Sequence, residues 1–190
     1  MLCASCSAEV VPEPSLVTRV GVDVPVWAAA RYEGVVRRLV PAFKDHQALG
    51  LERVLGWLLA TAISAGDWQG PIVLVPVRSS SKASRERGYQ HVDRIVRRAR
   101  TWLAHPPGVQ ALLRNRGAAD QGSLDLAARH RNLAGRMVAL TGASRVVVCD
   151  DVVTTGATLA EAIRALTAAG HTVVGCCVVA HTPRRHDGAG

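Results

Sequence analysis

The stretch that decides the fold runs from Val146 to Glu161 and reads VVVCDDVVTTGATLAE. Its apolar beginning predicts a buried strand, which we expect to end at Asp150 and Asp151. A turn rich in Thr and Gly follows, and the apolar residues after it recur at helical spacing. Thr158 and Glu161 have the spacing of a capping box, so the helix should begin at Thr158 or just before it. This order predicts one unit of an α/β sheet.

The turn after the two carboxylates is suited to a phosphate group. Ligands of open α/β sheets bind beyond the carboxyl ends of strands, where a helix N-terminus offers unpaired N–H groups and a positive potential. Gly156 lets the backbone turn tightly around an anion, and neighbouring hydroxyl groups add donors. The residues expected to take part are Val153, Thr154, Thr155, Gly156, Ala157 and Thr158.

Asp150 and Asp151 would repel a phosphate that they faced directly, so we expect them to contact another part of the ligand. Two adjacent sugar hydroxyls are suitable donors for ionised carboxylates. Successive strand residues point to opposite faces, so both can reach one sugar only if the chain leaves the strand at this pair. Phosphate next to a diol describes a ribose 5-phosphate group. Two alternatives are solvated residues at a strand end and direct ligands of Mg²⁺, an ion that usually keeps several waters.

The segment VVVCDDVVTTGAT resembles the signature of the type I phosphoribosyltransferases, which bind 5-phosphoribosyl 1-pyrophosphate (PRPP). The resemblance implies a mainly parallel central sheet flanked by helices, with a small N-terminal hood. It also implies binding of PRPP with Mg²⁺, and transfer of the phosphoribosyl group to a nitrogen nucleophile with release of pyrophosphate. Asp150 and Asp151 would be the catalytic pair that holds the ribose hydroxyls, and Val153 to Thr158 would bind the 5-phosphate.

A second segment, Pro76 to His91, follows the apolar run from Ile72 to Val77 and is rich in Arg and Ser. It resembles a stretch of the ComF-type subgroup of that family, whose members are associated with DNA uptake. The resemblance implies a pyrophosphate-binding loop of Arg78, Ser79, Arg85, Arg87 and Gly88. Arg suits this role because it can donate two hydrogen bonds to phosphate oxygens. Residues 89 to 91 depart from the subgroup, and a solvated basic loop is the alternative.

A third segment, Arg114 to Arg136, resembles the flexible loop of the ComF-type proteins. The matching residues are Arg114, Gln121, Arg129 and Asn132. In the wider family such a loop closes over the reacting sugar, which would keep water from an oxocarbenium-like centre. The alternative is a surface loop followed by an exposed helix face.

Three parts are expected along the chain: residues 1–25 as an N-terminal tail, 26–181 as the phosphoribosyltransferase domain, and 182–190 as a disordered basic tail. The N-terminal tail contains Cys3 and Cys6 in a CxxC pair, which resembles the remnant of a zinc ribbon. Structural zinc needs four ligands and the second pair is missing, so zinc is not expected. Zinc shared between chains, or completed by a residue such as His46, is the alternative.

Further elements follow from turn residues and apolar periodicity. Strands are expected at 26–32, 72–77, 109–113 and 172–180, and helices at 34–43, 49–65, 90–104, 159–169 and from about Ser123. Pro41 should end or kink the first of these helices, because it lacks the N–H group that a helix interior requires.

Composition narrows the class of protein. At 190 residues, with 48% hydrophobic and 20% charged, the chain suits one folded domain and excludes wholesale disorder. A net charge of +8 predicts a polyanionic partner, either a nucleic acid or a phosphate-rich small molecule. Aromatic residues make up only 4%, which argues against base stacking on single strands. No stretch has the pattern of a membrane span or a secretory signal, so we expect a soluble cytoplasmic protein.

Two functions remain open at this point. One is an active phosphoribosyltransferase. The other is a non-catalytic ComF-type factor that binds PRPP or DNA, with single-stranded DNA or a DNA-uptake helicase as partner. The excess charge on Arg94, Arg97, Arg98 and Arg100 is where a nucleic acid would bind. A homodimer is compatible with either function.

Overall fold

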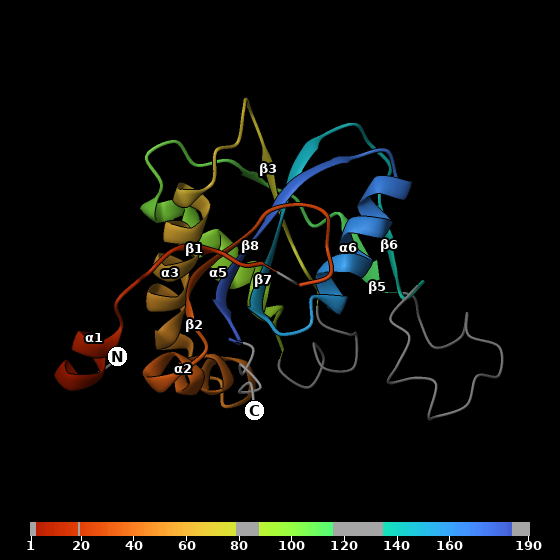
Figure 1. Ribbon diagram of the computed structural model, residues 1–190. Coiled ribbons are helices and arrows are strands. Elements are labelled where there is room, and N and C mark those ends of the chain that lie inside the picture. Colours follow the sequence, from red (N-terminus) through yellow and green to blue (C-terminus); the bar gives the residue numbers. More distant parts are fainter. Residues whose placement is uncertain (1–2, 19, 79–87, 116–134, 184–190) are drawn as a thin grey trace, which may run out of the picture.

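A six-stranded sheet runs through the computed structural model, which describes residues 3–18, 20–78, 88–115 and 135–183 (Figure 1). In spatial order its strands are β1 (Ser15–Leu16), β2 (Val26–Arg31), β8 (Thr172–His181), β7 (Arg145–Val153), β3 (Val73–Pro76) and β4 (Gly108–Val109). All neighbours are parallel except β1 and β2, which are antiparallel. The expected α/β fold with a mainly parallel sheet is thus confirmed.

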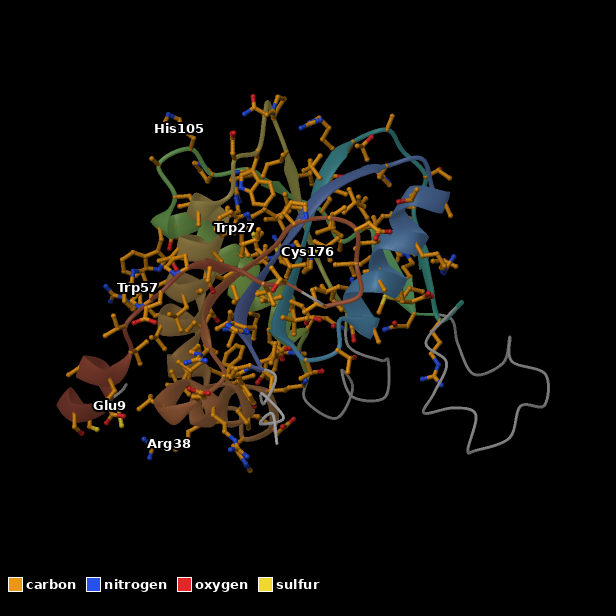
Figure 2. All side chains as sticks on the ribbon, viewed as in Figure 1. Glu9, Trp27, Arg38, Trp57, His105 and Cys176 are labelled. Carbon is orange, nitrogen blue, oxygen red and sulfur yellow. The ribbon has the colours of Figure 1, made fainter. Side chains whose placement is uncertain are left out.

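Different elements cover the two faces of the sheet. One face is covered by α2 (Gly34–Asp45), α3 (Glu52–Ala65) and α5 (His91–Ala99), and the other by α6 (Ala157–Ala168) with a two-stranded sheet of β5 (Leu113–Asn115) and β6 (Met137–Ala139) (Figure 1). Shorter elements are α1 (Ala4–Glu9) and the 3₁₀ turns η1 (Leu49–Leu51) and η2 (Arg100–Trp102). Side chains fill both interfaces, and Cys176 lies near the middle (Figure 2).

Strand alternation explains the two-sided core. Along β7, Val147 and Cys149 pack with the α3 and α5 side chains, whereas Val146 and Val148 pack with those of α6. All four are fully buried, and removing each such side chain from water contributes roughly 1.5–3 kcal/mol. A strand buried on both faces has to be apolar throughout, which is why the run before Asp150 contains no polar residue.

The N-terminal tail joins the main sheet and then crosses to the α6 side. β1 pairs with β2, and Val17 donates its N–H to the carbonyl of Val26 (2.8 Å). Beyond β1 the chain reaches the beginning of α6 (Figure 1), where Val20 is buried in the α6 core. The tail therefore forms part of the wall beside the turn that follows β7.

Two local expectations change. Pro41 does not end α2: the helix continues to Asp45, because the buried stripe that includes Val40 and Phe43 runs across the proline and packing outweighs the lost hydrogen bond. A kink at Pro41 stays a prediction. The strand expected at 109–113 is two strands, since the chain leaves β3 after the bond from Gln110 N–H to the Leu74 carbonyl and then pairs with β6.

Other boundaries shift less. The helix expected at 90–104 ends at Ala99 and passes into η2, and the helix at 49–65 begins with η1. The helix expected from Ser123 lies outside the described residues, as do residues 184–190. Among the residues that are described, no helix is both long and apolar enough to cross a membrane.

Candidate functional site

The carboxyl ends of β3, β7 and β8 meet at one edge of the sheet. The Val77 N–H donates to the carbonyl of Cys149 (2.8 Å), so β3 ends beside Asp150. The Thr182 N–H donates to the carbonyl of Val153 (2.9 Å), so β8 ends beside the turn into α6. Because ligands of such sheets bind at this edge, the geometry brings the predicted carboxylates and the predicted phosphate turn into one candidate site.

The turn that follows β7 depends on a left-handed glycine. Gly156 has φ +83° and is the N-cap of α6, which begins at Ala157 as expected. An ideal Cβ on Gly156 would lie 1.8 Å from the carbonyl oxygen of Val20. Both the backbone conformation and the N-terminal tail therefore exclude a side chain here.

The N-terminus of α6 remains open to an anion. No side chain caps this helix. Within the described residues, the Ala157 N–H donates a long hydrogen bond to Thr155 Oγ1 (3.4 Å). Thr154, Thr155 and Ala157 are exposed. Free N–H groups in the first turn, with the positive end of the helix dipole, are the features that bind phosphate. The expected capping box of Thr158 and Glu161 is not formed, since Glu161 has other partners.

Asp151 is held by a lysine and a histidine from the helices on one face of the sheet. Its Oδ2 accepts hydrogen bonds from His91 Nε2 (2.9 Å) in α5 and from Lys44 Nζ (3.4 Å) in α2, and its Oδ1 accepts from the Val152 N–H (2.7 Å). Burial by itself raises the pKa of Asp151. The hydrogen bond from His91 and the charges of Lys44 and His91 outweigh burial, so its pKa lies well below the usual range and it is ionised.

Asp150 has the opposite electrostatic environment. It is 7% exposed, and its Oδ1 accepts the Asp151 N–H (2.8 Å). Burial, the charge of Asp151 and the interaction between the two side chains raise the pKa of Asp150 well above its usual range. The surroundings of the two carboxyl groups thus shift their pKa values in opposite directions, that of Asp150 upwards and that of Asp151 downwards.

The expectation that the chain leaves the strand at this pair is wrong. β7 continues to Val153, because β8 runs beside it and pairs Asp150 with Val178 and Val153 with His181. Both carboxyl groups are therefore buried within the sheet edge, not on a free loop. Their different partners give them different electrostatic environments, which the sequence could not reveal.

Lys44 and His91 were missed as site residues by sequence reasoning. They lie 107 and 60 residues from Asp151 in the chain, so no local spacing connects them to it.

Residues 89 to 91, which depart from the ComF pattern, have a clear structural role. The Tyr89 hydroxyl donates to the carbonyl of Phe43, and the rings of these two residues are 5.8 Å apart, which joins α5 to α2.

Only the ends of the other two predicted loops are described. Arg78 and Gly88 border the first, and Arg114 begins the second as an exposed residue of β5. Ser79, Arg85, Arg87, Gln121, Arg129 and Asn132 lie outside the described residues. The Asn115 Nδ2 donates to the carbonyl of Arg78 (3.0 Å), so the two loops start from adjacent points.

A buried carboxylate joins α6 to β6 behind the turn. Glu161 Oε1 accepts the Met137 N–H (2.8 Å), and Glu161 Oε2 accepts Arg164 Nε (2.8 Å). Arg164 also donates to the Met137 carbonyl (2.8 Å), so both polar groups of this backbone residue are satisfied. Burial opposes ionisation, but these donors lower the pKa of Glu161. The spacing of Glu161 and Arg164 fits a helix pair, but nothing in the sequence identifies Met137 as their target.

Replacing Glu161 with Ala is expected to lower the free energy of unfolding by about 2–3 kcal/mol, because the buried Met137 N–H loses its acceptor. Glu161→Gln should cost less, since it keeps an acceptor. Urea unfolding followed by circular dichroism measures both. Arg97→Ala removes an exposed i,i+4 partner of Asp93 and should change stability by at most about 0.5 kcal/mol. Equal losses for the Glu161 and Arg97 variants would contradict this assignment.

The predicted cysteine pair lies away from this edge. Cys3 is exposed and precedes α1, and a hydrogen bond with Ser5 Oγ (3.2 Å) is the main cause that lowers its pKa to about 7. Cys149, Cys176 and Cys177 are buried free thiols. Across the ranges that the structure describes, no group of three or more His, Cys, Asp or Glu side chains could hold a metal ion.

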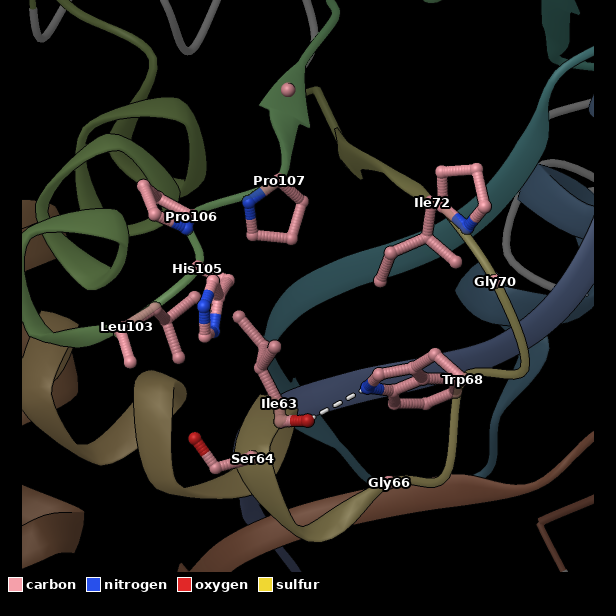
Figure 3. A pocket seen from close by; sticks show the side chains of 13 residues that line it. Ile63, Ser64, Gly66, Trp68, Gly70, Ile72, Leu103, His105, Pro106 and Pro107 are labelled. Carbon is pink, nitrogen blue, oxygen red and sulfur yellow. Dashed lines mark hydrogen bonds between the residues drawn. The ribbon is translucent and has the colours of Figure 1, made fainter.

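A cavity of about 720 Å³ lies at the opposite edge of the sheet, by the amino ends of β3 and β4 (Figure 3). It is lined mainly by apolar side chains, among them Ile63, Trp68, Ile72 and Leu103. The Trp68 indole N–H donates to the Ile63 carbonyl (2.7 Å) and fixes one wall. Among the described residues that line it there is no Lys or Arg, and His105 is its one titratable side chain.

Fold and site together define an α/β protein with an open helix N-terminus and a carboxyl pair at the carboxyl edge of its sheet. The sequence profile of the phosphoribosyl transferase domain matches residues 51–188, and this chain belongs to that family. The adenine phosphoribosyltransferase of Leishmania donovani is a similar solved structure, with 11% identity, a TM-score of 0.43, and coverage of 86% of this chain and 72% of that one. No curated protein sequence matches the chain.

Proposed function

We propose that this protein binds PRPP together with Mg²⁺ and transfers the phosphoribosyl group to a nitrogen nucleophile. The observation that carries the proposal is the open N-terminus of α6 behind Gly156, next to the Asp150 and Asp151 pair. The first suits the 5-phosphate, and a carboxyl group of the pair suits the ribose hydroxyls. Family membership supports the same ligand class.

In the proposed reaction the bond between C1 of the ribose and the pyrophosphate oxygen breaks, and a bond from C1 to the nitrogen forms. Pyrophosphate leaves with the bonding electrons, and the nitrogen loses a proton. The chain contributes by holding the two ends of the substrate: Val153 to Thr158 at the 5-phosphate, and the segment between Arg78 and Gly88 at the pyrophosphate. Catalysis is then positioning together with stabilisation of the departing negative charge.

The donor set at this edge fits Mg²⁺ that arrives with its ligand. Asp151 is already bonded to Lys44 and His91, and burial raises the pKa of Asp150, so the pair is poorly suited to form a cage of ionised carboxylates. Mg²⁺ keeps several waters and is commonly bound through substrate phosphates. When bound, it would supply neutralisation of the pyrophosphate charge.

The ComF-type assignment and a role in DNA uptake form the second candidate. One observation favours a DNA surface: Trp102 is 44% exposed, and the Arg53 guanidinium lies 5.5 Å from the centre of its ring. Another weakens it, because the arginines of α5 are paired with acids. Arg94 and Arg98 both bond Glu52. The excess charge expected on this helix is therefore partly neutralised.

Calorimetric titration with PRPP and MgCl₂ tests the first candidate. We expect wild type to bind PRPP more tightly than ribose 5-phosphate, because only PRPP also engages the pyrophosphate loop. Asp150→Asn should weaken PRPP binding by about tenfold or more, because an NH₂ group, which cannot accept a hydrogen bond, replaces one of the two carboxyl oxygens offered to the ribose hydroxyls. Asp93→Asn makes the same change on an exposed residue of α5 and should bind like wild type.

The outcomes separate the candidates. No binding of PRPP by wild type would refute the proposed function. Binding of PRPP followed by pyrophosphate release with a nucleobase supports the enzyme, and binding without release on any base supports the non-catalytic factor. Retention of single-stranded DNA that is lost in Trp102→Ala but unchanged in Asp150→Asn would assign DNA to the α3 and α5 side.

A further inference from the structure

One carboxylate of the pair is attached to two helices that the sequence did not connect with the site. The side chain of Asp151 is 9% exposed and that of His91 5%, whereas Lys44 is 36% exposed. One hydrogen-bond partner would satisfy a buried carboxylate oxygen, yet Oδ2 of Asp151 has two side-chain donors. A buried ion pair is weak evidence for stability, so its position at a ligand edge needs another reason.

The contacts of Asp151 leave it little capacity for a ligand. A carboxylate has about four acceptor positions, and three of those on Asp151 are taken by Val152, His91 and Lys44. Asp150 accepts one hydrogen bond from the backbone, that of the Asp151 N–H. The diol of a sugar bound at this edge would therefore find its main partner in Asp150.

We propose that His91 and Lys44 are positioning residues, which fix Asp151 between α5 and α2 so that Asp150 becomes the principal partner of the ribose hydroxyls. This inference rests on the proposed function of the site. The two residues act through Asp151 and do not touch the ligand themselves. Removing either frees the Asp151 carboxylate to turn, and the pair then presents two competing acceptors in place of one.

The two helices are held together next to these residues. Tyr89 is two residues before His91, and its hydroxyl donates to the carbonyl of Phe43, the residue before Lys44. The Arg94 guanidinium lies 5.6 Å from the Tyr89 ring centre on its other flank. The separation of His91 and Lys44 is thus set before any ligand binds, which is what a positioning role needs.

The test is PRPP titration, with MgCl₂, of His91→Leu and Lys44→Met. Each should weaken binding by about tenfold, the loss expected when a hydrogen bond to a charged group is removed. His91→Gln and Lys44→Arg keep a donor and should recover most of the affinity. In an Asp151→Asn background, the further loss caused by His91→Leu should shrink to less than about twofold, because the residue acts through Asp151.

His171→Leu is the matched control. His171 is as buried as His91 and is hydrogen-bonded to the Leu140 carbonyl (2.9 Å) and the Ser144 N–H (3.3 Å), but it lies at the amino end of β8. Its replacement should lower stability and leave PRPP affinity unchanged. If His91→Leu does not fold, Lys44→Met on its half-exposed side chain carries the same test.

The outcomes are distinct. Absence of PRPP binding by wild type refutes the proposed function and this inference with it. Wild-type binding with unchanged affinity in Lys44→Met and His91→Leu overturns the inference alone. Equal weakening by His91→Leu and His171→Leu, or no recovery in His91→Gln and Lys44→Arg, would also overturn it, since general stability would then explain the loss.

Discussion

Replacing Gly156 with Ala is expected to lower the free energy of unfolding by about 2–5 kcal/mol and to abolish PRPP binding. A residue with a Cβ costs about 1–2 kcal/mol in the left-handed conformation that Gly156 adopts, with φ +83°. The new Cβ would also lie 1.8 Å from the Val20 carbonyl oxygen, and relieving that overlap typically costs another 1–3 kcal/mol, about as much as overpacking a core. Moving either segment also displaces the first turn of α6.

Gly70→Ala separates these two causes. Gly70 has the same φ of +83°, but nothing lies within 4 Å of its ideal Cβ. Its replacement should cost about 1–2 kcal/mol and leave PRPP affinity unchanged. Urea unfolding and calorimetry on both variants measure the difference. If Gly156→Ala were no worse than Gly70→Ala, the N-terminal tail would not pack on the turn as described.

The fold could be predicted well from the sequence because the patterns that indicate it lie within short, contiguous segments. The apolar run of β7, the polar turn and the stripe of α6 are contiguous, and a parallel sheet follows from repeating such units. The failures come from contacts made elsewhere. Pro41 was one candidate for the end of α2, but the helix continues past it and buries Phe43. Helix propensity is a weak guide where packing decides.

The site was only partly predictable for the same reason. Asp150 and Asp151 are identical residues next to each other, and the sequence gives no ground for assigning them different roles. The difference comes from Lys44 and His91, which long-range folding brings to one carboxylate and not to the other. The contact of Val20 with Gly156 is likewise a tertiary event. What the sequence could supply was the list of chemical groups at this edge, not their partners.

Because their surroundings differ, the same substitution at the two aspartates should have opposite effects on stability. Asp150→Asn is expected to raise the free energy of unfolding at neutral pH by about 1–3 kcal/mol, since it removes a buried acid next to Asp151 and keeps an acceptor for the Asp151 N–H. Asp151→Asn should lower it by about 3 kcal/mol, because Lys44 loses its counter-ion and His91 loses its charged hydrogen-bond partner.

The pH dependence gives each effect a distinct form. The pKa of Asp150 is raised in the folded state, so its stabilising contribution is complete below about pH 4 and is lost as the pH rises towards the folded value. The difference in free energy of unfolding between Asp150→Asn and wild type should therefore appear above about pH 4, grow as the pH rises and then level off. Asp151 has a lowered pKa, so the deficit of Asp151→Asn should be complete above about pH 4 and shrink on further acidification.

Unfolding in urea at about pH 5 and about pH 8 measures the first trend. A gain in stability for Asp150→Asn that accompanies weaker PRPP binding would mean that the protein keeps a destabilising acid because the ligand needs it, as functional sites often do. If both variants were destabilised equally, the two carboxyl groups would share one environment. The division of roles between them, and with it the positioning role of His91 and Lys44, would then be wrong.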